Sequence, residues 1–325
     1  MDTTFATAAA PRKPLVHAAN IAAHRMQLAL ATVAVALPTM ATVLAFVLWL
    51  GYGIGFGPVE ATLLAGFYAL TIIGIGCGYH RLFTHQAYKT TTPVRVVLAI
   101  LGSMASQGPV LFWCAIHRRH HNFADTDGDS HSPYFNKETR MNRLVGFWHA
   151  HTGWLFSTEV TDWGRYIPDL LKDRPIFRVN QLYFVWIALG LAIPAAIGGL
   201  VHGTLAGAGY GLLWGGLVRT FFVHHSTWCI NSVCHVFGRR PFKINDEARN
   251  NWFVAILTFG EGWHNNHHAF PYAMSHRFKW YQYDPNGGIV KLLAKFGLAW
   301  DLRSPSAEAV REKLASAPAG HNAPG

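Results

Sequence analysis

The ten residues EGWHNNHHAF, at positions 261–270, place three histidines within five positions of a mostly apolar chain: His264, His267 and His268. On a helix, the spacing H-x-x-H-H brings these imidazoles to one face, because residues three and four apart are neighbours there. The same spacing occurs again in HRRHH at 117–121. For a chain with 19 histidines among 325 residues, chance predicts about 0.06 copies of the pattern. Two copies therefore indicate a metal-binding histidine site.

Two further elements add histidines at the ends of apolar segments. HRLFTH (80–85) carries His80 and His85, and NSVCH (231–235) carries Asn231 and His235. On an ideal helix the ends of H-x-x-x-x-H differ by about 140°, so His80 and His85 are expected to approach a site from different sides. The four elements supply nine candidate ligands: His80, His85, His117, His120, His121, His235, His264, His267 and His268.

The number and type of these side chains limit the metal. Nine imidazoles exceed the needs of one four-coordinate zinc ion and suffice for two adjacent metals. Imidazole binds zinc, copper, iron and nickel, so ligand type alone does not name the metal. An all-histidine pair with few carboxylates nearby, set against a membrane, favours redox-active iron.

The composition indicates an all-α integral membrane protein. The chain is 51% hydrophobic and 14% charged, against roughly 25% charged residues in soluble domains. Four segments, 27–50, 59–79, 180–201 and 205–223, reach the span of about 20 apolar residues that a bilayer requires. The two short connections between them lack Lys and Arg, so both termini and the histidine site are expected to face the cytoplasm. A buried soluble helix is the alternative for 205–223.

The remaining segments suggest one membrane domain, 27–303, between a cytosolic tail, 1–26, and a polar Pro/Ala-rich tail, 304–325, that is expected to be disordered. The apolar stretch 94–116 is interrupted by Gly102, Gly108 and Pro109, which predicts an interfacial helix pair. The net charge of +10 is interpreted as membrane-flanking charge and not as a nucleic-acid surface. The four cysteines form no C-x-x-C pair and are expected to be free thiols.

Five elements resemble those of the membrane fatty-acyl desaturases of the stearoyl-CoA (Δ9) type. They are GYHRLFTH (78–85), HRRHH (117–121), GWLF (153–156), TWCINSVCHVFG (227–238) and EGWHNNHH (261–268). The resemblance implies four transmembrane helices capped by a cytosolic helical domain that carries a di-iron site. It implies that the nine histidines bind two non-haem irons, with Asn231 acting on one iron through a water. The implied reaction uses O₂ and two electrons to insert a cis double bond, at Δ9, into a saturated acyl chain.

The resemblance also suggests how the substrate and partners are arranged. It places Tyr68 and Ile72 at the closed end of an acyl tunnel, with ordinary packing as the alternative for Tyr68. Apart from the resemblance, His131 and His151 are candidates either for groups behind the metal ligands or for plain loop residues. The animal acyl-CoA enzymes have an Arg-Asp pair and a basic segment where this chain has Ala115-Ile116 and Ser157-Thr158-Glu159. The acyl carrier therefore stays open among a glycerolipid, CoA and acyl carrier protein.

An external electron donor completes this interpretation. The chain contains no H-P-G-G motif of a fused cytochrome b5. A ferredoxin, a rubredoxin or a cytochrome b5 with its reductase is expected to supply electrons. The bacterial-like sequence favours a multi-pass protein of a bacterial inner membrane.

Two alternatives remain. The first is a sister reaction on the same metals: hydroxylation, acetylenic-bond formation or carotenoid oxygenation. HRLFTH does not match the boxes of alkane hydroxylases, whereas an acetylenase is not distinguished by sequence. The second is a non-enzymatic membrane metal-binding or transport protein, which should carry ionisable groups in mid-membrane. The predicted spans contain almost none, so an enzyme is favoured.

Overall fold

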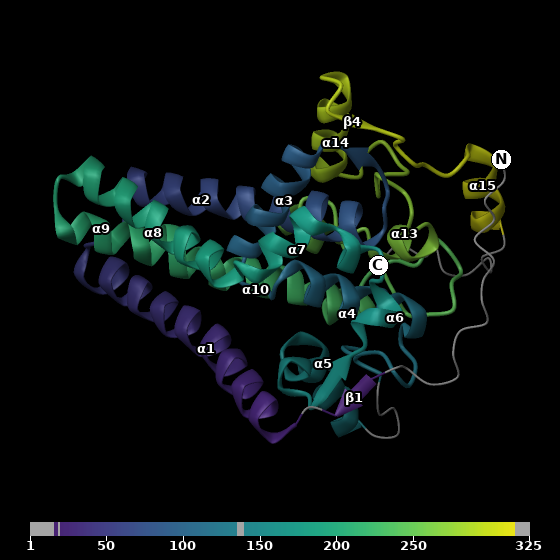
Figure 1. Cartoon of the computed structure of the whole chain (residues 1–325), viewed down its shortest axis with the longest axis horizontal. Coiled ribbons are helices and arrows are strands. Elements are labelled where there is room, and N and C mark those ends of the chain that lie inside the picture. The colour runs from purple at the N-terminus through teal and green to yellow at the C-terminus, as the bar shows by residue number, and fades with distance from the viewer. Residues whose placement is uncertain (1–15, 19, 135–139, 316–325) are drawn as a thin grey trace.

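A computed structural model describes residues 16–18, 20–134 and 140–315 of the chain. It shows a long helical bundle joined at one end to a domain of short helices and loops (Figure 1). The bundle contains α1 (Ile21–Phe46) with its π-helical end η1 (Val47–Gly51), α2 (Pro58–Ile73) with η2 (Gly74–Thr84), and α8 (Tyr183–His202). A further continuous helical segment consists of α9 (Leu205–Gly211), η5 (Leu212–Val218) and α10 (Arg219–Asn231).

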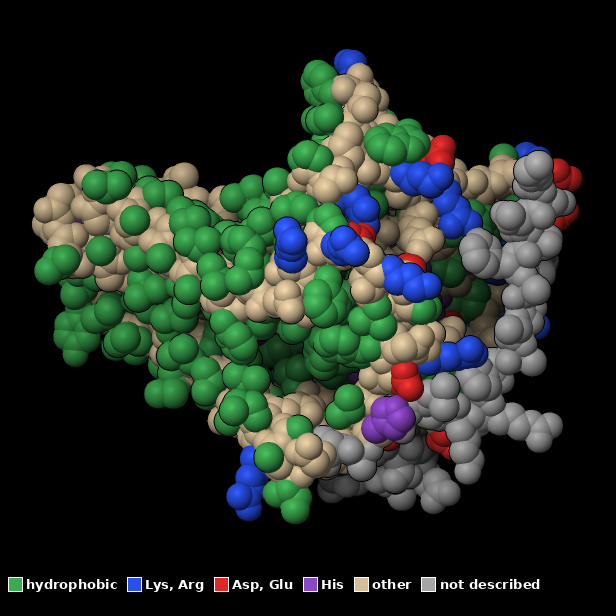
Figure 2. All heavy atoms as spheres, in the orientation of Figure 1, with side chains coloured by type: hydrophobic (Ala, Val, Ile, Leu, Met, Phe, Trp, Pro, Cys, Tyr) green, Lys and Arg blue, Asp and Glu red, His purple; other side chains and the backbone are tan. Residues whose placement is uncertain are grey.

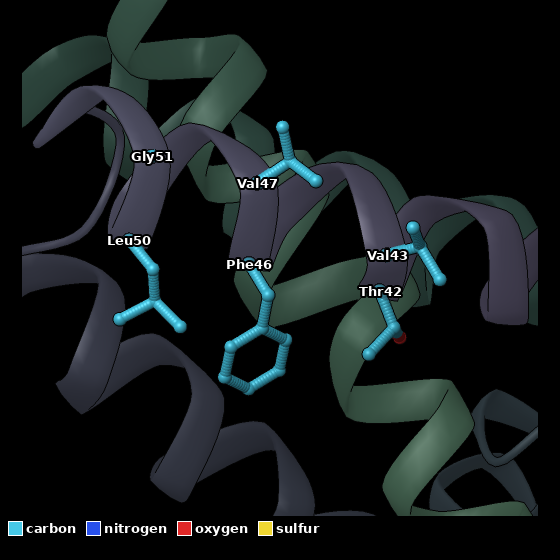
Figure 3. A pocket seen from close by; sticks show the side chains of 6 residues that line it. All are labelled: Thr42, Val43, Phe46, Val47, Leu50 and Gly51. Carbon is cyan, nitrogen blue, oxygen red and sulfur yellow. The ribbon is translucent and has the colours of Figure 1, made fainter.

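Three helices in the described ranges are long and apolar enough to cross a membrane: Ile21–Gly51, Pro58–Thr84 and Tyr183–His202. They coincide with the first three predicted spans, and hydrophobic side chains cover this part of the molecule (Figure 2). An apolar hollow on α1 and η1, lined by Thr42, Val43, Phe46, Val47, Leu50 and Gly51, lies at the end of α1 that is remote from the short helices (Figure 3). The absence of charge there fits contact with lipid tails.

The fourth predicted span stays a prediction. Its segment is helical, but its glycines and Arg219 make it less apolar than the other three. Small residues allow α9 to approach α8 closely, because a Cβ on Gly198 would lie 2.4 Å from the Gly207 carbonyl oxygen. Arg219 is fully buried and donates to the carbonyl oxygens of Met104 and Gly190 at 2.7 and 3.1 Å. It thus connects this helix to two neighbours through backbone groups.

Short helices form the other end of the molecule. The interruption predicted within 94–116 is confirmed at Gly108 and Pro109, which lie between α3 (Thr92–Met104) and α4 (Val110–Phe123), whereas Gly102 lies inside α3. The further helices are α5 (Arg140–His151), η3 (Gly153–Phe156), α6 (Trp163–Tyr166), η4 (Leu170–Lys172), α7 (Arg174–Gln181), α11 (Val233–Val236), α12 (Trp252–Leu257), α13 (His264–Ala269), α14 (Pro285–Lys295) and α15 (Ala307–Ala315).

Four short strands depart from the all-α expectation. β1 (Val16–Ala18) pairs antiparallel with β3 (Glu159–Thr161), and β2 (Lys89–Thr90) pairs antiparallel with β4 (Ala299–Trp300). Each pair connects a segment near one end of the sequence to a segment from its middle: 16–18 to 159–161, and 299–300 to 89–90. The main core cluster packs side chains of η2, α3 and α4, so the first two histidine elements stand on rigid helices.

Helices extend into both predicted tails. Residues 21–26 belong to α1, whose N-cap Asn20 accepts a hydrogen bond from the Ala23 amide at 2.8 Å. The expectation of disorder from residue 304 is wrong for Ala307–Ala315, which form α15. This helix packs Val310 and Leu314 against a cluster that includes Phe270. Residues 1–15 and 316–325 lie outside the described ranges.

Candidate metal centre

The structure brings all nine predicted histidines together and divides them into two groups. His80, His85, His117, His121 and His267 form a five-histidine group, and His120, His235, His264 and His268 form a four-histidine group. Within each group the ligand atoms lie within 4.8 Å of one another. The H-x-x-H-H helices α4 and α13 each contribute to both groups. The same pair of helices therefore contributes to two neighbouring candidate metal positions.

In the five-histidine group, Nε2 atoms converge. The Nε2 of His267 lies 3.1 Å from that of His80 and 2.9 Å from that of His121. His80 and His85 face the same group because a π-helical bond, 3.1 Å from the His85 amide to the His80 carbonyl oxygen, closes the turn between them. Their ring planes are 84° apart, so the two imidazoles approach one position from different sides.

The four-histidine group shows the same convergence. The Nε2 atoms of His235 and His264 are 3.1 Å apart, and those of His120 and His268 are 3.4 Å apart. This group has one imidazole fewer than its neighbour. Asn231 is the last residue of α10 and precedes His235 by four residues.

Four carboxylates orient these rings from behind. In each pair a histidine Nδ1 lies close to a carboxylate oxygen. The distances are 2.6 Å for His80–Glu261, 2.9 Å for His120–Asp129, 2.8 Å for His235–Asp125 and 2.9 Å for His268–Asp246. A ring that donates Nδ1–H to a carboxylate keeps its Nε2 lone pair free for a metal. The expectation of few carboxylates near the site is therefore wrong. The missed signals were the acidic run ADTDGD (124–129), directly after the second element, and Glu261 at the start of the third.

Arg81 adds a second ion pair behind His80. Its guanidinium is fully buried and lies 2.9 Å from Glu261 and 2.8 Å from Asp284. Arg81 was not predicted as a site residue, although it lies within HRLFTH. The hydrogen-bonded series His80–Glu261–Arg81–Asp284 connects the first histidine element to the third and to the start of α14.

The electrostatics suit neutral ligands held by ionised carboxylates. Burial, reinforced by neighbouring imidazoles, lowers the pKa of His117, His121 and His267 well below the ordinary value. Burial alone would raise the pKa of Asp129, yet His120 brings it below its usual range. For Glu261 the same opposition holds: burial raises the pKa, and Arg81 together with His276 and His80 brings it below its usual range.

The donor set fits metal ions. His85 Nε2 is buried and has no hydrogen-bond partner in the described part of the chain, although it faces four other imidazoles. Neutral imidazoles carry one N–H each, so Nε2 atoms crowded at about 3 Å cannot all be satisfied by one another once Nδ1 donates elsewhere. A cation at each group would satisfy these lone pairs, and an all-nitrogen set suits iron, zinc, copper or nickel.

The two predicted supporting histidines differ in position. His131 lies beside the four-histidine group: its ring centroid is 4.4 Å from that of His120, and burial with His120 lowers its pKa to about 3. His151 belongs to neither group. Its Nδ1 lies 2.9 Å from Ser232 Oγ, next to Asn231, and its Nε2 lies 3.0 Å from His225 Nδ1.

The two predicted tunnel residues stand on the helix that leads to His80. Ile72 is buried in the main core, whereas the Tyr68 hydroxyl lies 2.7 Å from the Leu257 carbonyl oxygen and 2.9 Å from Ser226 Oγ. Tyr68 therefore bridges α2, α10 and the end of α12. Neither residue belongs to a histidine group.

The apolar helices and the paired histidine groups together define a candidate membrane metalloprotein. The chain belongs to the fatty acid desaturase family of oxidoreductases, whose model matches residues 57–301. It is 46% identical over 279 residues to a hex-5-enoyl-[acyl-carrier protein] acetylenase of Moorena producens, covering 85% of this chain and 86% of that protein. It is 38% identical over 244 residues to an sn-1 stearoyl-lipid 9-desaturase of Synechocystis, covering 74% and 70%. It is 37% identical over 255 residues to a palmitoyl-monogalactosyldiacylglycerol delta-7 desaturase of Arabidopsis thaliana, covering 77% and 63%.

Proposed function

We propose that this enzyme is an O₂-dependent desaturase that inserts a cis double bond, at Δ9, into a saturated acyl chain. The observation that carries the proposal is the division of nine histidines into adjoining groups of five and four. Two irons would occupy these groups, with Asn231 holding a water at the four-histidine group. Iron with O₂ would supply the oxidising power needed to remove hydrogen from two neighbouring methylenes.

The chain's own residues would hold and insulate this centre. Glu261, Asp129, Asp125 and Asp246 fix the orientation of four imidazoles, and most of the ligands are buried. Fixed ligands in a water-excluding site favour one geometry over the alternatives. Three helices that are long and apolar enough to span a membrane, with a fourth span proposed at 205–223, would place the site at the cytoplasmic face of a bacterial inner membrane. An external ferredoxin, rubredoxin or cytochrome b5 would deliver electrons there.

The acyl carrier is proposed to be a glycerolipid or acyl carrier protein rather than CoA. Ala115 and Ile116 are buried on α4, and Glu159 pairs with Arg119. These positions therefore provide no basic side chain to bind the CoA head group. The relatives' names include an acyl carrier protein in one, a stearoyl-lipid in another and acyl-CoA in others, so CoA stays an alternative carrier that a binding measurement must separate.

A direct test is expression in a bacterial host, with gas chromatography–mass spectrometry that locates double bonds, beside a His267→Ala control. New monoenes that the control lacks support desaturation and report regiochemistry and chain length. An alkynyl product would instead establish the second candidate, an acetylenase, which the 46% identity to such an enzyme favours. A hydroxylated product would contradict both, as would no product from an enzyme loaded with two irons and supplied with reductant.

Tyr68→Ala is expected to move the preferred substrate to longer chains. The phenol fills space between α2, α10 and α12, and truncation would leave a cavity at the proposed closed end of the tunnel. The chain-length distribution of the products would measure the change. Tyr68→Phe is the matched control, because it keeps the ring and should keep the wild-type distribution. An unchanged distribution in Tyr68→Ala would remove Tyr68 from the tunnel.

His151→Gln is expected to lower turnover about tenfold, because His151 contacts Ser232, the neighbour of Asn231 that is proposed to hold a water at the metal centre. All three hydrogen bonds are satisfied when Ser232 donates to the Trp228 carbonyl oxygen and accepts Nδ1–H from His151, while His151 Nε2 accepts from His225 Nδ1–H. An Asn side chain reproduces the Nδ1 donor and a Gln side chain does not, so His151→Asn should retain most activity. Equal losses in both variants would show that His151 does not act through Ser232.

A further inference from the structure

Helix α7 presents a basic face next to a membrane span. It buries Ile176 and Val179 and exposes Arg174, Phe177 and Arg178. The N-cap Asp173 accepts a hydrogen bond from the Ile176 amide, which fixes where the helix begins. Only Leu182 separates α7 from α8, which begins at Tyr183. With α8 as a membrane span, the exposed face of α7 is expected to lie at the membrane surface.

This face carries a groove with positive walls. The groove has a volume of about 230 Å³ and is lined by Leu171, Arg174, Phe177, Arg178 and Gln181. The arginines are four residues apart and so lie one turn apart on the same side of the helix. Figure 2 shows Lys and Arg side chains over α7, where the hydrophobic surface of the bundle ends.

The two guanidinium groups are not neutralised within the described chain. The acidic residues nearest in sequence point elsewhere: Asp173 pairs with Arg95, and Asp169 lies 2.6 Å from Arg118. No ion pair or hydrogen bond of the Arg174 or Arg178 side chain occurs in residues 16–18, 20–134 and 140–315. Two free guanidinium groups beside an apolar ring attract an anion that also carries hydrocarbon.

We propose that the α7 groove binds the phosphate of an anionic membrane phospholipid. The arginine forks match phosphate oxygens, while Phe177 and Leu171 would contact the glycerol and upper acyl region. A membrane lipid is favoured over a soluble acidic protein because the groove joins directly onto α8 and has exposed apolar walls. The site is separate from the histidine groups and does not depend on the reaction proposed for them.

Native mass spectrometry of the full chain in detergent, titrated with phosphatidylglycerol or phosphatidylcholine, tests the proposal. Each Arg→Gln change should weaken the tightest phosphatidylglycerol binding about fivefold, and the double variant Arg174→Gln/Arg178→Gln roughly 25-fold if the effects add. Arg311→Gln, an exposed change of the same charge on α15, should bind as the wild type does. Phosphatidylglycerol should also raise the melting temperature of the wild type more than that of the double variant.

Two results would overturn the proposal. One is equal phosphatidylglycerol affinity in the double variant and in Arg311→Gln. The other is unchanged lipid binding together with a loss of affinity for acyl carrier protein, which would assign the groove to a protein partner. Because both arginines are exposed, the variants are expected to keep the wild-type melting temperature in the absence of lipid. This measurement serves as the control for correct folding.

Discussion

Replacing His267 by alanine is expected to reduce turnover more than 100-fold while the protein still inserts into the membrane. His267 is central to the five-histidine group, since its Nε2 lies 3.1 and 2.9 Å from the Nε2 atoms of His80 and His121. Removing a group that only supports a ligand typically costs about 10–100-fold in metal affinity or activity, so loss of a ligand should cost more. His120→Ala and His235→Ala should behave similarly through the four-histidine group.

The measurement combines metal content with product formation. Elemental analysis of the purified wild type should give two irons per chain, and His267→Ala should give fewer. His17→Ala is a suitable control, because His17 is an exposed histidine on β1 outside both groups. Full activity with two irons in His267→Ala would exclude it as a ligand. Two bound zinc ions in an active wild type would instead overturn the choice of iron.

The histidines could be predicted from sequence because their spacing is local. In H-x-x-H-H the helix itself places the ligands together, so HRRHH and HNNHH are informative without the fold. The division into five and four could not be predicted. It depends on how α4 and α13 cross, with His120 and His121, adjacent in sequence, assigned to different groups. Side chains on neighbouring helical positions diverge, and only tertiary packing decides what each one meets.

The carboxylates illustrate the opposite case. Asp125 reaches His235 and Asp246 reaches His268 from loops, and no periodic pattern connects these partners. The helix α15 was missed for a related reason. Its sequence is polar and rich in alanine, and it gains stability by packing Val310 and Leu314 against the cluster around Phe270. Such contacts override a composition that predicts disorder.

Glu261→Gln is expected to weaken metal binding about 10–100-fold at the five-histidine group. The substitution keeps the shape of the side chain but removes the charge that holds His80 Nδ1–H at 2.6 Å. It also leaves the buried Arg81 with Asp284 as its one remaining carboxylate partner in the described chain. A buried charge left without any partner typically costs about 3–5 kcal/mol. Because Asp284 still pairs with Arg81, the variant should unfold more easily but lose less stability than that.

Metal affinity and stability must therefore be measured separately. Iron titration of the folded variant reports the first, and thermal unfolding of the metal-free protein reports the second. Glu247→Gln is the matched control: Glu247 is partly exposed and pairs with Arg240, so its loss should cost about 1 kcal/mol or less. If Glu261→Gln lowers stability yet binds iron with wild-type affinity, Glu261 supports the fold and not the ligand. If it lowers iron affinity in the folded protein, the carboxylate behind His80 is part of the metal centre.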